Sequence, residues 1–275
     1  MIFYFTGTGN SLYVAKKIQE SEGGELIDMG IALNEKKFHY KIEKGEKIGL
    51  VFPVYFMGLP PIVAEFVKQL NLETNETPFI YTVITCAVLV GNADKDLTKL
   101  FESKNLQLNS SYSVKMPDNY VMVFENIIAT MIAGHYYGKD INSALDTAEK
   151  QIEELIESVK KEEKGYFAKQ GFAPIPTFSS LYYGFYGIIR NTKKFYATEK
   201  CTNCGQCERV CPSKVIQMKD GKPVWIKEKC SHCTACINRC PSQGIEYGKS
   251  TKKRERYLNP YIKFKDHENK SEFEV

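Results

Sequence analysis

The chain has 275 residues, 43% of them hydrophobic and 25% charged, and a formal net charge of +4. These values are typical of a globular protein with room for two domains. No uncharged stretch is both long enough and apolar enough for the roughly 18 residues of a membrane-spanning helix, and the N-terminus shows no signal-peptide pattern. We therefore expect a cytoplasmic protein without a membrane span.

The charge is distributed unevenly along the chain. Residues 1–164 contain 17 Lys and no Arg against 23 Asp and Glu, which gives −6, whereas residues 165–275 contain 20 Lys and Arg against 10 acids, which gives +10. Opposite charges favour docking of the two halves on each other. Nucleic-acid binding is the other use of a basic half, but the basic residues are scattered and no recognised binding motif accompanies them, so we expect no nucleic-acid partner.

The first expected strand is the apolar run at residues 2–5. A loop with two glycines follows at residues 6–11, and residues 12–18 have helical spacing. Backbone N–H groups, hydroxyl groups and the positive end of a helix converge in such a loop, which favours an anion such as phosphate. The loop fits neither a Walker motif nor a dinucleotide motif. An ordinary strand-to-helix turn is the alternative.

This loop, Thr-Gly-Thr-Gly-Asn-Ser, is similar to the FMN-phosphate loop of flavodoxins. The resemblance implies a flavodoxin-like domain that binds FMN. It also implies that the whole loop contacts the cofactor: Thr6, Gly7, Thr8, Gly9, Asn10 and Ser11.

Residues 49–61 predict a buried strand that ends in a loop, with a helix at about residues 62–70. By the same resemblance, this is the second flavin loop, with Pro53, Val54, Tyr55, Phe56, Met57 and Gly58 as contacts. Either Tyr55 or Phe56 is expected to stack on the flavin ring, and the Gly58 peptide is a candidate partner for flavin N5. Packing in the protein core is the alternative for both aromatic side chains.

Residues 78–85 predict a third buried strand, with a helix at about residues 94–104. The resemblance implies a third flavin loop between them, with contacts from Thr85, Cys86, Ala87, Gly91 and Asn92. Many relatives have more glycine here than this chain, which has Ala-Val-Leu at residues 87–89. The unpaired Cys86 is expected to be a buried structural thiol, and a flavin contact is its alternative role.

A further strand is expected at residues 112–116, followed by the turn Pro-Asp-Asn-Tyr. Resemblance to flavodoxin–ferredoxin fusions implies that Asn119 and Tyr120 in this turn also face the cofactor. Residues 142–164 predict an amphipathic helix. Strands that alternate with helices predict an α/β fold with a doubly wound, five-stranded parallel sheet over residues 1–164. The cofactor then belongs at the carboxyl ends of the strands, next to the first one.

Residues 165–197 form a connector that is rich in aromatic residues and contains Pro174 and Pro176, which prevent one continuous helix. We expect these rings to fill the seam between the two halves. Binding to a lipid surface is the alternative.

Eight of the nine cysteines form two copies of the pattern C-x2-C-x2-C-x3-C-P, which begin at Cys201 and Cys230. Disulfides are unexpected in a cytoplasmic chain, and structural zinc sites would not require the third cysteine or the proline. The pattern closely resembles bacterial-type ferredoxins, which implies two [4Fe-4S] clusters in a small α+β domain at residues 198–248. In such ferredoxins the fourth cysteine of each motif ligates the other cluster. The implied sets are Cys201, Cys204, Cys207 and Cys240, and Cys211, Cys230, Cys233 and Cys236.

Residues 249–275 form a basic tail whose charged run at residues 252–256 is expected to be solvated, while the apolar residues after it fold back onto the body. Trp225 is expected to pack over a cluster. His232 lies between two ligands but is not needed as one, so we expect it to face solvent.

Together these features predict an iron–sulfur flavoprotein of an anaerobic organism that relays electrons between the clusters and FMN, with a redox protein as donor or acceptor. The alternative is an FMN-dependent oxidoreductase that reduces a small organic substrate. The chain lacks a nicotinamide loop, and only Tyr55, Tyr120 and Cys86 are candidates for acid–base chemistry near the flavin loops. We therefore favour the carrier and assign no catalytic residue. A homodimer is left open.

Overall fold

The computed structural model describes residues 1–122, 141–169 and 175–264. Its main sheet has six parallel strands in the order β2-β1-β4-β6-β7-β8. Their bounds are β2 (Leu26–Asp28), β1 (Ile2–Tyr4), β4 (Ile48–Pro53), β6 (Ile80–Cys86), β7 (Ser110–Lys115) and β8 (Gly165–Tyr166). The first five confirm the predicted doubly wound sheet.

The sixth strand was not predicted. β8 consists of Gly165 and Tyr166 alone, and it pairs with Ser110 and Ser111 at the start of β7. So short a strand leaves no periodic pattern in the sequence, and only the tertiary structure adds it to the sheet.

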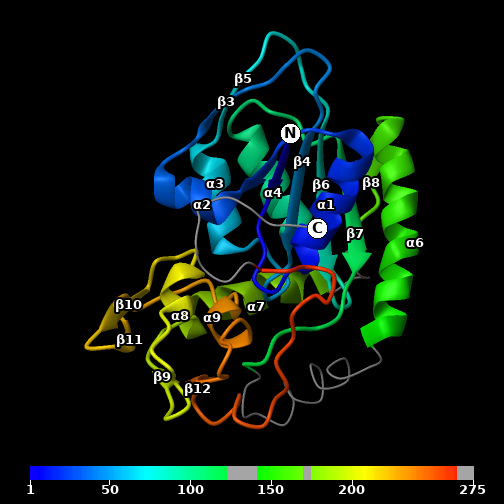
Figure 1. The fold of residues 1–275 in the computed structure, drawn as a ribbon. Coiled ribbons are helices and arrows are strands. Elements are labelled where there is room, and N and C mark those ends of the chain that lie inside the picture. The colour runs from blue at the N-terminus through cyan, green and yellow to red at the C-terminus, as the bar shows by residue number, and fades with distance from the viewer. Residues whose placement is uncertain (123–140, 170–174, 265–275) are drawn as a thin grey trace.

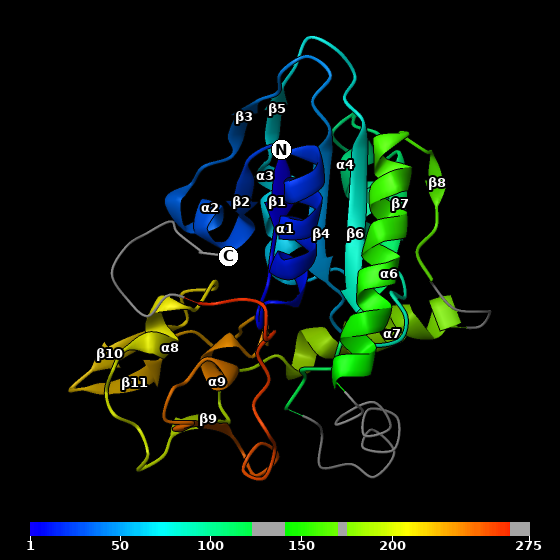
Figure 2. The ribbon, with the colours of Figure 1, turned by 45° about the vertical axis from the view of Figure 1, so that its right-hand side comes forward.

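Helices cover both faces of the sheet (Figure 2). Helices α2 (Met29–Glu35), α3 (Pro61–Gln69) and α4 (Ala93–Glu102) pack on one apolar core, and α1 (Asn10–Glu22) and α6 (Ile141–Lys160) pack on the other. The apolar face predicted for α6 is the face it buries, although the helix ends at Lys160 and not at the expected residue 164. A two-stranded parallel pair, β3 (His39–Lys41) and β5 (Asn71–Glu73), lies outside the main sheet.

The second part of the chain forms a smaller α+β unit (Figure 1). Strand β9 (Phe195–Ala197) pairs antiparallel with β12 (Ile245–Tyr247), and β10 (Ile216–Lys219) pairs with β11 (Lys222–Trp225). Asp220 and Gly221 both have positive φ, of 48° and 75°, as the tight turn of a hairpin requires. The short helices α8 (Gln206–Arg209) and α9 (Ala235–Asn238) complete the unit.

Helix α7 (Ile175–Ile189) lies between the two parts, below the carboxyl ends of the main strands (Figure 1). It begins directly after Pro174 and tolerates Pro176 in its first turn, where no backbone donor is needed. Among the described residues, no helix is both long enough and apolar enough to cross a membrane.

The tail returns to the amino-terminal part, and one member of its charged run is not solvated. Lys252, Lys253 and Glu255 are exposed, but Arg256 forms an ion pair of 3.0 Å with Glu246 on β12, with both side chains at most 10% exposed. Arg256 also donates to the backbone oxygens of Thr251 and Ile245. The expectation of a solvated run is therefore wrong for Arg256, because its guanidinium anchors the tail.

The packing of α6 leads to a stability prediction. Ile152 is 2% exposed in the core under α6, so Ile152→Ala should lower the free energy of unfolding by about 2–5 kcal/mol through lost burial and a residual cavity. Glu153→Ala, on the exposed side of the same helix turn, should change it by less than about 0.5 kcal/mol. Urea unfolding followed by circular dichroism measures both, and equal effects would contradict this packing.

Candidate functional site

The loop between β1 and α1 is a buried polar cradle. Thr6, Thr8, Asn10 and Ser11 are each at most 8% exposed. The Thr6 hydroxyl accepts a hydrogen bond from Gly9 N at 3.0 Å, and Gly9, at φ 104°, precedes a helix that has neither a side-chain cap nor an acidic residue in its first turn. The uncapped N–H groups and the hydroxyls gather where a helix is most positive, so these residues fit a phosphate group.

The tail holds this loop from outside. Asn10 Oδ1 accepts hydrogen bonds from Tyr257 Oη at 2.7 Å and Asn259 Nδ2 at 3.1 Å, and Asn259 N donates to Thr8 O at 2.9 Å. A Cβ on Gly9 would lie 2.9 Å from Asn259 Cβ. The sequence predicted that the tail folds back, but gave no sign that its polar side chains reach this loop.

The second predicted loop is a tight turn after β4. Tyr55 and Gly58 exchange two backbone hydrogen bonds, of 3.1 and 3.0 Å, around Phe56 and Met57, which have positive φ of 50° and 63°. This backbone region is unfavourable for side chains with a Cβ, and it is found at ligand-binding sites more often than elsewhere. Val54 N, just before the turn, donates to Thr85 O.

The third predicted loop supports the second. Asn92 N donates to Met57 O at 2.9 Å, and a Cβ on Gly91 would lie only 2.3 Å from the same oxygen. Ser11 and Thr85 share a hydrogen bond of 2.7 Å, which joins the third loop to the first.

Cys86 and Ala87, two predicted flavin contacts in the third loop, differ in their burial. Cys86 is 5% exposed in the apolar core, where burial raises the pKa of its thiol to about 12, as a structural cysteine requires. Ala87 is half-buried beyond the end of β6.

The turn after β7 completes the arrangement. Asn119 Nδ2 donates to the Thr8 hydroxyl, and the Tyr120 and Phe56 rings form an edge-to-face pair with their centres 5.4 Å apart. The carboxyl ends of β1, β4, β6 and β7 thus bring all four predicted flavin loops together, as the topology of a doubly wound sheet demands.

The two cysteine motifs have the same backbone shape. Positive φ occurs at Asn203, Gly205 and Lys214 in the first copy and at the corresponding positions of the second copy, His232, Thr234 and Gln243. Val215 N donates to Cys211 Sγ at 3.4 Å, and Gly244 N donates to Cys240 Sγ at 3.2 Å. N–H donors to thiolate sulfur stabilise the charge of an iron–sulfur cluster, so both loops fit such a group.

Cysteines of the two motifs lie near enough to influence one another's pKa. Burial raises the pKa of Cys207 to about 11, and the neighbouring thiols of Cys240 and Cys201 raise it further. Burial likewise raises the pKa of Cys236, and its strongest cysteine neighbours are Cys233, Cys211 and Cys230, with Cys207 weaker. In each group one cysteine comes from the other motif.

One of these groups faces the flavin loops. A Cβ on Gly7 would lie 2.2 Å from Cys233 O, and one on Gly30 of α2 would lie 2.8 Å from Cβ of Pro212, the residue after Cys211. We call Cys211, Cys230, Cys233 and Cys236 the proximal set. Cys201, Cys204, Cys207 and Cys240 are the distal set, in which Cys204 is exposed.

Two aromatic side chains of α7 pack in the seam, as predicted for the connector, but other aromatic residues of the connector do not: Phe185 of the same helix is 47% exposed, and Tyr166 and Phe167 are 56% and 50% exposed. The Tyr186 ring stacks on Phe56 at 4.5 Å with an interplanar angle of 12°, and its hydroxyl donates to Ser231 O at 2.6 Å. Tyr183 packs against Gly58 and donates to Leu59 O. Phe56, one of the two side chains expected to stack on flavin, therefore packs against Tyr186, a partner that sequence reasoning did not single out.

The expectation for His232 is wrong. Its side chain is 3% exposed, Nε2 lies 3.0 Å from Asn191 O, and burial lowers its pKa to about 4. A neutral imidazole packed against Phe195 and Tyr247 is a wall of the cluster unit rather than a solvent-facing group. Trp225 stacks on Phe195 with the ring centres 5.4 Å apart, and it packs against the group of buried apolar residues that includes Cys207.

Comparison with known proteins finds two families. A flavodoxin domain matches residues 1–124, and a 4Fe-4S dicluster domain matches residues 193–257. Comparison with curated proteins finds no match.

Two solved structures show a partial likeness to the chain. A candidate flavoprotein from Bacteroides uniformis is 14% identical over 42% of this chain and 88% of that chain, with a TM-score of 0.33. Rubredoxin:oxygen oxidoreductase from Desulfovibrio gigas is 12% identical over 58% of this chain and 36% of that chain, with a TM-score of 0.31. The two domain matches, found in one chain with the sheet and cysteine motifs described above, correspond to a fusion of a flavodoxin domain with a 4Fe-4S dicluster domain and support an iron–sulfur flavoprotein in electron transfer.

Proposed function

We propose that this protein relays electrons between two [4Fe-4S] clusters and FMN. When bound, the clusters supply one-electron transfer and FMN supplies one- or two-electron chemistry. The observation that carries the proposal is the contact of Gly7, in the loop that fits the phosphate, with the carbonyl of Cys233 in the proximal set. No side chain separates these two loops, so cofactors held in them lie close together.

We assign one role to each segment, in chain order. Residues 1–164 form the FMN domain, residues 165–197 the connector, residues 198–248 the cluster domain and residues 249–275 the tail. The flavin contacts are those in the four loops named above, and the proximal and distal sets each hold one cluster. Electrons pass between a partner and FMN through the distal and then the proximal cluster.

The packing beside the flavin loops favours a carrier over an FMN-dependent reductase of small organic molecules. Phe56 stacks on Tyr186 and forms an edge-to-face pair with Tyr120. A carrier needs no open substrate pocket beside these rings, whereas a reductase does.

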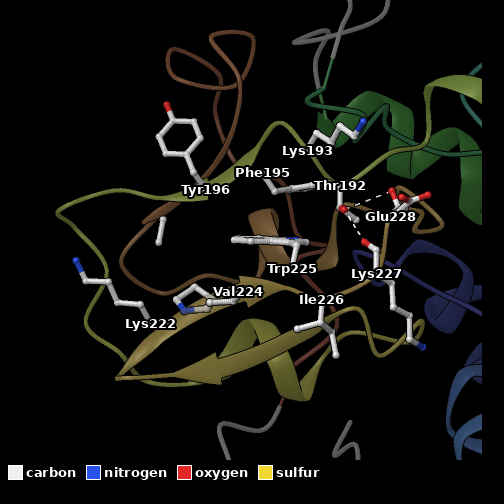
Figure 3. A pocket seen from close by; sticks show the side chains of 12 residues that line it. Thr192, Lys193, Phe195, Tyr196, Lys222, Val224, Trp225, Ile226, Lys227 and Glu228 are labelled. Carbon is white, nitrogen blue, oxygen red and sulfur yellow. Dashed lines mark hydrogen bonds between the residues drawn. The ribbon is translucent and has the colours of Figure 1, made fainter.

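We further propose that a redox protein with an acidic surface docks beside Trp225. An open groove of about 570 Å³ lies there, and Trp225 forms its centre, parallel to Phe195 (Figure 3). Val224 and Ile226 on the same wall are 40% and 48% exposed. Exposed apolar side chains around a half-buried tryptophan are typical of a protein interface.

The charge of the groove suggests the kind of partner. Lys193, Lys222 and Lys227 lie around it, against one acid, Glu228 (Figure 3). A basic rim around an apolar centre attracts an acidic surface and speeds its association. Phe195 and Trp225 pack with cysteines of both sets, so a partner docked here would be near the clusters.

The composition of the purified protein tests the relay. Anaerobic preparation followed by iron, sulfide and flavin analysis should give eight iron atoms and one FMN per chain, and redox titration should resolve two clusters and a flavin. Two zinc ions per chain without flavin would end the proposal.

Serine substitutions test the crossed sets. Cys211→Ser and Cys233→Ser should each remove or alter the same cluster signal in spin-resonance spectra, because both belong to the proximal set, while Cys204→Ser should affect the other signal. Cys86→Ser should leave both signals in place. If Cys211→Ser and Cys204→Ser lose the same signal, the crossed assignment is wrong.

Charge reversal tests the groove. The double variant Lys193→Glu, Lys222→Glu should slow electron transfer from a reduced ferredoxin of net negative charge by about tenfold at low salt. High salt should shrink the difference, because exposed charges are screened. Lys44→Glu, an exposed control in the turn before β4, should have little effect. Equal rates in stopped-flow traces of the wild type and the double variant would exclude this docking face.

A further inference from the structure

Arg239 links the two cofactor loops through its side chain. It follows α9 and precedes Cys240 of the distal set, yet its Nε donates to Gly7 O at 2.9 Å. Gly7 is the same residue whose Cα faces Cys233 O. The guanidinium thus binds the carbonyl oxygen of the same residue that the Cys233 carbonyl approaches.

The surroundings keep Arg239 charged and limit its access to water. Phe264 of the tail lies 3.7 Å from the guanidinium carbon, measured to the ring centre. Burial lowers the pKa of Arg239 to about 10, and the nearby Cys233 thiol and Asp28 carboxyl oppose that shift, so the side chain is a cation at neutral pH. Asp28 already accepts hydrogen bonds from Gly30 N and Ile31 N at the start of α2.

A cation here is surrounded by sites for negative groups. A phosphate monoester carries close to two negative charges near neutral pH, and an oxidised cluster with four thiolates carries about −2. Reduction makes a cluster more negative by one unit, so a nearby positive charge stabilises the reduced form and raises its reduction potential. Because the guanidinium is partly enclosed, salt screens this effect less than at the surface.

We propose that Arg239 is a positioning residue that fastens the phosphate loop to the proximal cluster loop and, by its charge, raises both the affinity for FMN and the reduction potential of the proximal cluster. This inference rests on the proposed function, because it requires FMN in the first loop and a cluster on the proximal set. A residue that only stabilised the domain contact would leave the potential unchanged.

The test uses the full chain with its clusters. In Arg239→Gln, FMN should bind about tenfold or more weakly, since a charged hydrogen bond of this kind is lost, and the potential of the proximal cluster should shift to lower values. The potential of the distal cluster should stay nearly constant. Fluorescence titration of the flavin-free protein gives the affinity, and a redox titration followed by spin resonance gives both potentials.

A matched control is Arg209→Gln. Arg209 is the last residue of α8, one position earlier in the repeat than Arg239, and it donates to Cys204 O at 2.8 Å, so it lies beside the distal set. This variant should leave FMN affinity and the proximal potential unchanged. Arg239→Lys keeps the positive charge but loses the Nε hydrogen bond. The reduction potential of its proximal cluster should therefore stay close to the wild-type value, while FMN should bind more weakly than to the wild type.

The outcomes separate the two proposals. A wild-type protein without FMN or without eight iron atoms would refute the relay itself. With a normal wild type, an iron-replete Arg239→Gln variant that has unchanged FMN affinity and an unchanged proximal potential would overturn this inference. If the Arg239→Gln variant fails to assemble its clusters, the Arg239→Lys variant provides the test instead. Two results for Arg239→Lys would overturn the inference: an FMN affinity equal to that of the wild type, or a lower reduction potential of the proximal cluster despite the retained charge.

Discussion

The contact on which the site depends is the approach of the first strand-to-helix loop to a cysteine loop of the other domain. Gly7 has no side chain, and any Cβ at that position would overlap the Cys233 carbonyl at 2.2 Å. The same peptide accepts a hydrogen bond from Arg239. Both loops lie at the ends of regular elements, and this short contact is one of several that join the two parts of the chain.

Aromatic packing stabilises the contact between the first loop and the cysteine loop. Tyr186 joins Phe56 in the second flavin loop to Ser231 in the proximal cysteine loop. Burying such rings between two oppositely charged halves contributes apolar stabilisation and excludes water. The basic and acidic halves therefore meet through an apolar seam, with their charges acting mainly on orientation.

The two cysteine motifs have nearly the same backbone, but their roles differ because of their neighbours. The left-handed positions recur at matching places in the two copies, and so do the N–H donors to sulfur. Only the second copy adds a carbonyl that meets Gly7 and a buried imidazole that packs on Phe195. An internal repeat thus places one predicted ligand set next to the predicted flavin loops and leaves Cys204 of the other predicted set exposed.

Local patterns determined the parallel sheet, the four loops at its carboxyl edge and the two cysteine motifs, because strand periodicity, loop composition and ligand spacing are properties of short segments. Other features required the tertiary structure. These features are the choice of proximal set, the contacts of Tyr186 and Arg239, and the burial of His232. Each depends on which side of a loop contacts residues that are distant in the sequence. Strand β8 exists only because β7 offers an edge to pair with. Sequence spacing gives no direction for such side chains, since docking of the two domains decides it.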